Sequence, residues 1–113
     1  MINPAINRIE HMIDACEKKI IKFTDVEYST YEQSDEKQAA VARYFEILGE
    51  AANKVSVAIH HKYPNIPWRI ATGLRNILIH DYVKVDYSEL WKTAKVNIPP
   101  MLSELQKIYK KLL

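Results

Sequence analysis

The feature that most constrains the fold is an apolar stripe in the middle of the chain. Apolar side chains recur at three- and four-residue steps, at Val41, Phe45, Leu48, Ala52, Val55 and Ile59. This spacing places them on one face of an α-helix, whereas a half-buried strand would alternate at every second residue. Gly49 lies beside the stripe and costs a helix about 1 kcal/mol relative to alanine, so we expect close packing there. The pattern predicts one long helix, unbroken from 41 to 59.

Glycine is scarce, and this favours helices throughout the chain. Only two of the 113 residues are glycine. A β-rich chain would need more of them for its turns. The length suits one domain with one hydrophobic core. We therefore predict an all-α fold, an up-down bundle of four to five helices, in a single domain spanning residues 1–113.

The first helix is predicted from a second apolar stripe. Asn3-Pro4 is typical of a helix start, with a capping side chain followed by proline. Ile6, Ile9, Ile13, Cys16 and Ile20 then share one face, and the helix is expected to end near Phe23. Residues 24–37 have no sustained period and are interpreted as a connection that leads to a helix cap at Ser34 or Asp35.

The C-terminal half is predicted to form two more helices. "HHKYPNIP" contains two prolines and ends the central helix, and a shorter helix restarts at Asn65 and Pro67. "DYVKVD" is expected to form a turn, with Asp86 and Glu89 at capping-box spacing for the last helix. Pro99-Pro100 falls inside this last stripe, which predicts a kink or a short break.

Bulk charge and cysteine content limit the class of protein. The formal net charge is +2, which marks no strong electrostatic footprint and no broad basic patch for nucleic acid. The single Cys16 cannot form an internal disulfide, indicates a reducing compartment and is expected to pack inertly in the core. No apolar run is long enough for a bilayer, and the N-terminus lacks a signal-peptide layout. These features predict a cytoplasmic protein.

Two residue groups offer only weak functional signals. His60 and His61 are adjacent and therefore point about 100° apart on a helix. No cysteine pair or acidic partner stands at ligand spacing beside them, so we predict surface histidines near a helix end and no metal site. The aromatic residues lie mostly at helical spacings, which core packing explains, although a stacking platform for bases is an alternative.

The stretch "RNILIHDY", residues 75–82, concentrates reactive side chains on an otherwise apolar segment. Arg75 and Tyr82 are seven residues apart and share a face of an ideal helix, whereas His80 lies about 140° from Arg75 around the axis. Arginine and histidine therefore converge only if the helix ends near Ile79 or if Arg75 reaches across. A capped helix end with a solvated histidine is an equally good interpretation of the residues alone.

A family resemblance bears on this choice. Arg75, His80 and Tyr82 stand in the spacing R-x-x-x-x-H-x-Y, which resembles the signature of HepT-like toxins in the HEPN superfamily of small all-helical domains. Asn76 occupies a position that is often Asn, Asp or His there. "YFEILGEAANKVS", residues 44–56, is similar to the Gly-Glu-Ala helix that precedes the motif in this family. Helix order and length match over nearly the whole chain.

The resemblance implies a metal-independent endoribonuclease without a cofactor. A histidine with a pKa near 6.5 can act as base or acid at neutral pH, which suits His80. The guanidinium of Arg75 can hold two non-bridging phosphate oxygens and keeps its charge. Asn76 and Tyr82 would line the same groove. The expected products are a 2′,3′-cyclic phosphate and a 5′-hydroxyl.

The resemblance also implies partners. HEPN ribonucleases place two motifs face to face across a homodimer, so the cleft for RNA, either tRNA or mRNA, would be composite. HepT-like toxins form type VII toxin–antitoxin systems with an MntA-like nucleotidyltransferase antitoxin that attaches AMP to the motif tyrosine, here Tyr82. Added bulk and negative charge would repel an RNA backbone.

Two other interpretations remain open at this stage. The chain can be a non-catalytic HEPN subunit that presents a nucleotide or substrate to a separate nucleotidyltransferase, with Arg75 and His80 binding phosphate without cleavage. It can also be a purely structural helical dimer. A cleavage assay without divalent metal separates the first of these from a ribonuclease.

Overall fold

The computed structural model describes the backbone of residues 3–79 and 85–113 and the side chains of residues 3–74 and 85–113. Over these residues the chain is all-helical, which confirms the predicted fold class. The elements are α1 (Ala5–Asp14), the π-helical η1 (Ala15–Ile20), α2 (Ile21–Thr24), α3 (Tyr28–Glu32), α4 (Asp35–Lys54), α5 (Val57–Lys62), α6 (Trp68–Ile79), α7 (Tyr87–Val96) and α8 (Ile98–Leu112).

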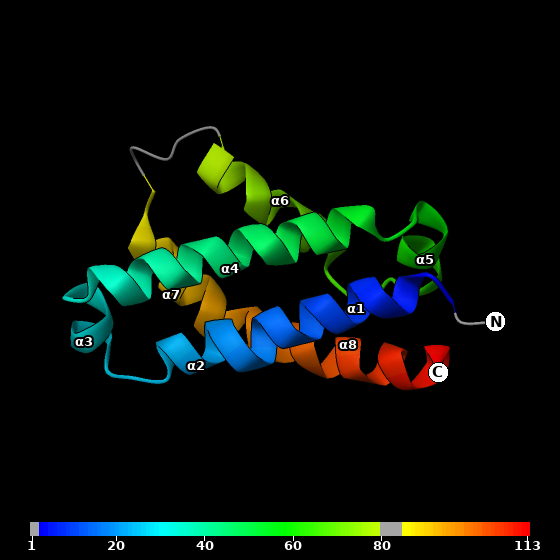
Figure 1. Ribbon diagram of the computed structural model, residues 1–113, viewed down its shortest axis with the longest axis horizontal. Coiled ribbons are helices and arrows are strands. Elements are labelled where there is room, and N and C mark those ends of the chain that lie inside the picture. The colour runs from blue at the N-terminus through cyan, green and yellow to red at the C-terminus, as the bar shows by residue number, and fades with distance from the viewer. Residues whose placement is uncertain (1–2, 80–84) are drawn as a thin grey trace.

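Helix α4 is the central element of the bundle. In Figure 1 it lies between α6 on one side and the N-terminal rod of α1, η1 and α2 on the other. Helix α8 runs along α1, so both chain ends lie at the same end of the molecule. The largest fully buried side chains come from most of these helices and form one core: Tyr31, Phe45, Ile9, Met12, Ile20, Leu48, Ile66, Leu90, Ile98, Met101, Leu105 and Val41.

The predicted first helix is confirmed as a continuous rod that ends at Thr24. Asn3 Oδ1 accepts a hydrogen bond from the backbone N–H of Ala5, at 2.9 Å, as its capping role predicts. The rod widens to a π-helix over Ala15–Ile20, which includes Cys16. Burial raises the pKa of the Cys16 thiol to about 12, so the inert core role predicted for this residue is confirmed.

The prediction of one unbroken helix from 41 to 59 is wrong. Helix α4 ends at Lys54, Val55 is extended, and α5 starts after Ser56. The Ser56 hydroxyl accepts from the N–H of Ile59 at 3.3 Å and so caps the new helix. Val55 is nevertheless buried and Ile59 packs against the core, so the apolar spacing continues across the break.

The connection expected over residues 24–37 also contains a helix, α3, that was not predicted. Five residues are too few to show a helical period. Its Tyr31 is fully buried and donates its hydroxyl to the carbonyl of Tyr87, at 2.8 Å, across the bundle. The cap predicted at Ser34 is confirmed, because Ser34 Oγ accepts from the N–H of Lys37 at 3.1 Å.

The predicted interruption of the last helix is confirmed and falls at Asn97, between α7 and α8. Pro99 and Pro100 occupy the first turn of α8, where the backbone N–H that proline lacks is not needed. Across residues 3–79 and 85–113, none of the helices is both long enough and apolar enough to cross a membrane.

Candidate active site

Helix α6 carries the first residues of the motif and is fixed by one buried face. Trp68, Ala71 and Leu74 are buried, and α6 makes its main packing contact with α4. Their spacing of three residues keeps them on one side of the helix. Arg75 and Asn76 follow directly on the same helix. Core packing of the preceding turn therefore sets the position of their backbone.

The start of α6 is held by the connection from α5. The indole N–H of Trp68 donates to the carbonyl of Tyr63 at 2.9 Å. The backbone N–H of Trp68 donates to the carbonyl of Ile66 at 2.8 Å, and the N–H of Ala71 donates to the carbonyl of Pro67 at 3.0 Å. Proline immediately before the first residue suits a helix start because its φ is already helical. The predicted restart at Asn65 and Pro67 is therefore confirmed.

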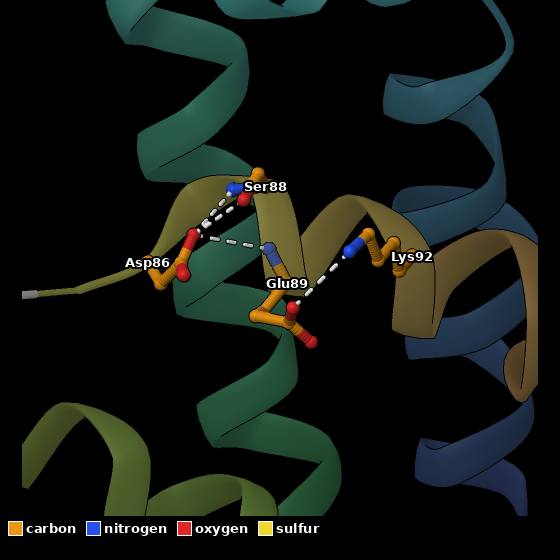
Figure 2. A network of polar contacts seen from close by, with 4 residues as sticks. All are labelled: Asp86, Ser88, Glu89 and Lys92. Atoms are coloured by element: carbon orange, nitrogen blue, oxygen red, sulfur yellow. Dashed lines mark hydrogen bonds and ion pairs between the residues drawn. The ribbon is translucent and has the colours of Figure 1, made fainter.

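On the other side of the motif, α7 begins at a strong cap (Figure 2). Asp86 Oδ1 accepts from the N–H of Ser88 at 3.0 Å, from the N–H of Glu89 at 3.2 Å and from the Ser88 hydroxyl at 2.6 Å. The Ser88 hydroxyl and these N–H groups lower the pKa of Asp86 below its ordinary 3.8. Glu89 pairs with Lys92 at 3.4 Å instead of reaching back, so the aspartate half of the predicted capping box is the half observed.

An aromatic cluster on α3 and α7 also holds the start of α7. The Tyr31 and Trp91 ring centroids are 4.9 Å apart, and Tyr28 meets Trp91 edge-on at 5.3 Å. Together with the hydrogen bond from Tyr31 to the Tyr87 carbonyl, these contacts attach the first turns of α7 to α3. Both flanks of the motif are therefore built on the core.

The predicted site residues divide into two groups. Arg75 and Asn76 have a described helical backbone in α6, and their side chains lie outside the described residues. His80 and Tyr82 lie entirely outside the described residues. The convergence of Arg75 with His80 therefore stays a prediction.

The paired histidines occupy the last turn of α5, as predicted. His61 is exposed, whereas His60 is half-buried and stacks on Trp68, with ring centroids 4.2 Å apart and an interplanar angle of 16°. Its Nε2–H donates to the carbonyl of Ala52, at 3.1 Å. The prediction of two surface histidines is thus wrong for His60, which is a packing residue. Among the described side chains, no three His, Cys, Asp or Glu residues cluster as metal ligands would.

Sequence comparison decides the family. The profile described as "Ribonuclease HepT-like" matches residues 9–108. The chain belongs to the HepT-like ribonuclease family. This membership implies the HEPN fold and agrees with the all-helical architecture.

Individual relatives of the HepT-like family agree with this assignment. "Putative RNase MJ0125" of Methanocaldococcus jannaschii is 43% identical over 94 residues, 82% of this chain and 81% of its own. "Putative RNase MJ1216" of the same organism is 41% identical over 103 residues, 90% of this chain and 81% of its own. "Probable ribonuclease HepT" of Thermococcus cleftensis is 41% identical over 73 residues, 65% of this chain and 66% of its own. No solved structure matches the chain.

One feature suited to a ribonuclease was missed by the sequence analysis. Residues 51–80 contain no Asp or Glu, although they contain Lys54, Lys62, Arg69, Arg75 and three histidines. The net charge of +2, summed over the whole chain, hides this acid-free stretch. Counting charges in windows along the chain finds this acid-free stretch, whereas the expected absence of a broad basic patch concerns the folded surface and stays a prediction.

Proposed function

We propose that the chain is the toxin of a toxin–antitoxin pair, a metal-independent endoribonuclease that cuts tRNA or mRNA. The observation that carries the proposal is membership of the HepT-like ribonuclease family in a chain that holds Arg75, Asn76, His80 and Tyr82 at the family spacing. The acid-free stretch of residues 51–80, which leads into the motif and ends before Asp81, supports it, because a polyanion is attracted to a segment with cations and no acidic residue.

In the proposed reaction His80 accepts the proton of a ribose 2′-hydroxyl. The 2′-oxygen attacks the adjacent phosphorus, and the bond from phosphorus to the 5′-oxygen breaks. The leaving 5′-oxygen receives a proton from the protonated imidazole of the second copy's motif histidine, which gives a 2′,3′-cyclic phosphate and a 5′-hydroxyl. Arg75 holds the non-bridging oxygens, where charge builds up on the crowded phosphorane, and Asn76 orients the phosphate. The step needs no oxidant and no metal.

The proposed enzyme is a homodimer with a composite cleft. One chain supplies one Arg75 and one His80, and acid and base roles at a single phosphodiester are best shared between two copies. The outer side of α6 supports a partner there. Ile70 is 43% exposed on it, and a Cβ added to Gly73, one turn further, would meet no described atom within 4 Å. A glycine on this side, which has no Cβ, leaves room for close approach of a second helix.

The proposed regulation acts on Tyr82. A nucleotidyltransferase antitoxin of the MntA-like type would transfer AMP to the tyrosine hydroxyl and release pyrophosphate from ATP. The adenylate would add bulk and negative charge within the groove and repel the RNA backbone. Mass spectrometry of the chain purified with and without the antitoxin measures this modification directly.

The test of the activity is cleavage of total RNA and of purified tRNA in EDTA. We expect the parent to cut and His80→Ala or Arg75→Ala to lose at least about 100-fold in rate, the lower end for a lost acid–base group. Circular dichroism should show equal helicity in all three proteins. If His80→Ala cuts as fast as the parent, the mechanism is wrong. If the parent binds RNA without cutting it, the chain is the non-catalytic subunit instead.

A further inference from the structure

An open pocket of about 710 Å³ lies at the opposite end of α6 from the motif. The end of α4, α5, the α5–α6 connection and the first turns of α6 line it. Its floor includes Ile66, Trp68 and His60, and its rim carries polar side chains, Asn53, His61, Arg69 and Thr72. Aromatic and aliphatic floors with a few polar groups at the rim are typical of ligand pockets in proteins.

The floor is rigid, because each of its ring systems is tied to the backbone. His60 covers Trp68 in the stack described above and is held to the carbonyl of Ala52, at 3.1 Å. Trp68 is only 8% exposed and is held to the carbonyl of Tyr63. The pocket is therefore formed before any ligand enters, which lowers the ordering cost of binding.

The charge of the rim selects the ligand. Of the described residues that line the pocket, none is acidic, while Arg69 and two histidines are present. Arg69 and His61 are both exposed and can reach a bound anion. The guanidinium binds phosphate oxygens through two parallel N–H groups. A phosphodiester fits this rim better than a cation or a neutral peptide.

The position of the pocket relates it to the motif. Arg69 and Arg75 lie on the same helix, six residues apart. Six residues correspond to about 9 Å of rise along the axis. Their side chains also leave the helix about 120° apart around its axis, so an RNA strand that leaves the motif must wind part of the way around α6 to reach Arg69.

We propose that this pocket binds the single-stranded RNA that flanks the scissile phosphodiester. Arg69 and His61 contact a backbone phosphate, and Asn53 and Thr72 face the adjoining sugar and base. The ligand is unpaired RNA, because an unstacked nucleotide can enter a pocket that a duplex cannot. The inference rests on the proposed function for the position of the cut, and adds a second contact region that sets the length of RNA recognised.

The binding test uses the His80→Ala background, so that RNA stays intact, and a fluorescein-labelled single-stranded oligonucleotide. Arg69→Glu should weaken binding at least about tenfold in fluorescence anisotropy, since one charge-assisted contact is replaced by repulsion. Lys110→Glu on α8 is the matched control, because Lys110 lines a separate pocket with Glu10, Asp14 and Glu17. Unchanged affinity in Arg69→Glu overturns the inference, and so does an equal loss in Lys110→Glu.

A second measurement separates this inference from the proposed cleavage site. In the active protein, Arg69→Glu should lower kcat/KM at least about tenfold for the oligonucleotide and leave a dinucleotide substrate unaffected. An equal loss on both substrates would assign Arg69 to the cleavage site and overturn the flanking role. The binding assay still measures the contribution of the pocket to RNA affinity even if His80→Ala shows that the cleavage mechanism is wrong. Equal sedimentation and melting of parent and Arg69→Glu exclude changes in dimerisation or folding.

Discussion

The two ends of α4 differ in both charge and packing. Near its N-terminus, residues 25–36 carry five acidic residues and no lysine or arginine. There Tyr31 of α3 is fully buried against Trp91, and its hydroxyl is bonded. Near its C-terminus, residues 51–80 carry no acidic residue. There α5 (Figure 1) buries none of its residues, and α5 and the first turns of α6 line an open pocket.

The comparison separates residues that hold the fold from residues available for ligands. The end around α3 is closed by aromatic packing, so its acidic residues remain outside and repel a polyanion. The end around α5 leaves its cations exposed beside a preformed pocket. The net charge of +2 is summed over the whole chain, in which these two unlike regions largely cancel, so neither region is visible in the sum.

The largest expected effect is on the aromatic packing at the end around α3. Tyr31→Ala removes a fully buried ring, and we expect a loss of about 3–5 kcal/mol in the free energy of unfolding. Tyr31→Phe keeps the ring, removes the bond to the Tyr87 carbonyl and should cost about 1 kcal/mol. Urea denaturation measures both. RNA affinity of Tyr31→Phe should equal that of the parent, and a weaker affinity would contradict the separation of the two ends.

A smaller effect on stability, together with an effect on RNA affinity, is expected at the end around α5. Arg69→Ala is an exposed substitution and should change the free energy of unfolding by no more than about 0.5 kcal/mol. The plot of log affinity for single-stranded RNA against log salt concentration should become shallower by about 0.7, the contribution of one phosphate contact. Titrations at several salt concentrations test this. An unchanged slope would show that Arg69 meets no phosphate.

The last expected effect concerns the cap of α7 and depends on pH. Asp86→Ala removes the acceptor of three hydrogen bonds and should lower Tm by a few degrees at neutral pH. Because the pKa of Asp86 is lower in the folded state than its ordinary 3.8, the cap stabilises fully above pH 3.8. This stabilisation is lost as the pH falls through the folded pKa. Thermal melts of parent and variant should therefore converge at low pH, and a constant difference would contradict the cap.

Features governed by near neighbours in the chain were predictable. The caps at Asn3, Ser34 and Asp86 were all expected, because a cap depends on a few residues. The break at Ser56 was not, because the apolar spacing continues across it and the serine was outweighed by the stripe. Short helix α3 lacked enough residues to show a period.

The candidate site was predictable only as a motif. Spacing and family resemblance indicate Arg75, His80 and Tyr82. Whether two of these side chains meet depends on where the helix ends and, in the proposed dimer, on a second copy of the chain, and a short motif encodes neither. The pocket beside Arg69 depends on a stack between His60 and Trp68, eight residues apart on different helices. The acid-free stretch, by contrast, was present in the sequence and required only counting over a shorter window.

The extended residues between α4 and α5 have a consequence for sequence variation. Since α5 starts afresh at Ser56 and contributes no fully buried side chain, its exposed residues can change without opening a cavity in the bundle, whereas Ile59 and His60 pack against the core and Trp68. Under the proposed RNA-binding role of the pocket, relatives that differ at these exposed residues would prefer different nucleotides beside the cut, while α6 keeps its packing. Exchanging α5 between members of the family would then alter the specificity of the proposed cleavage.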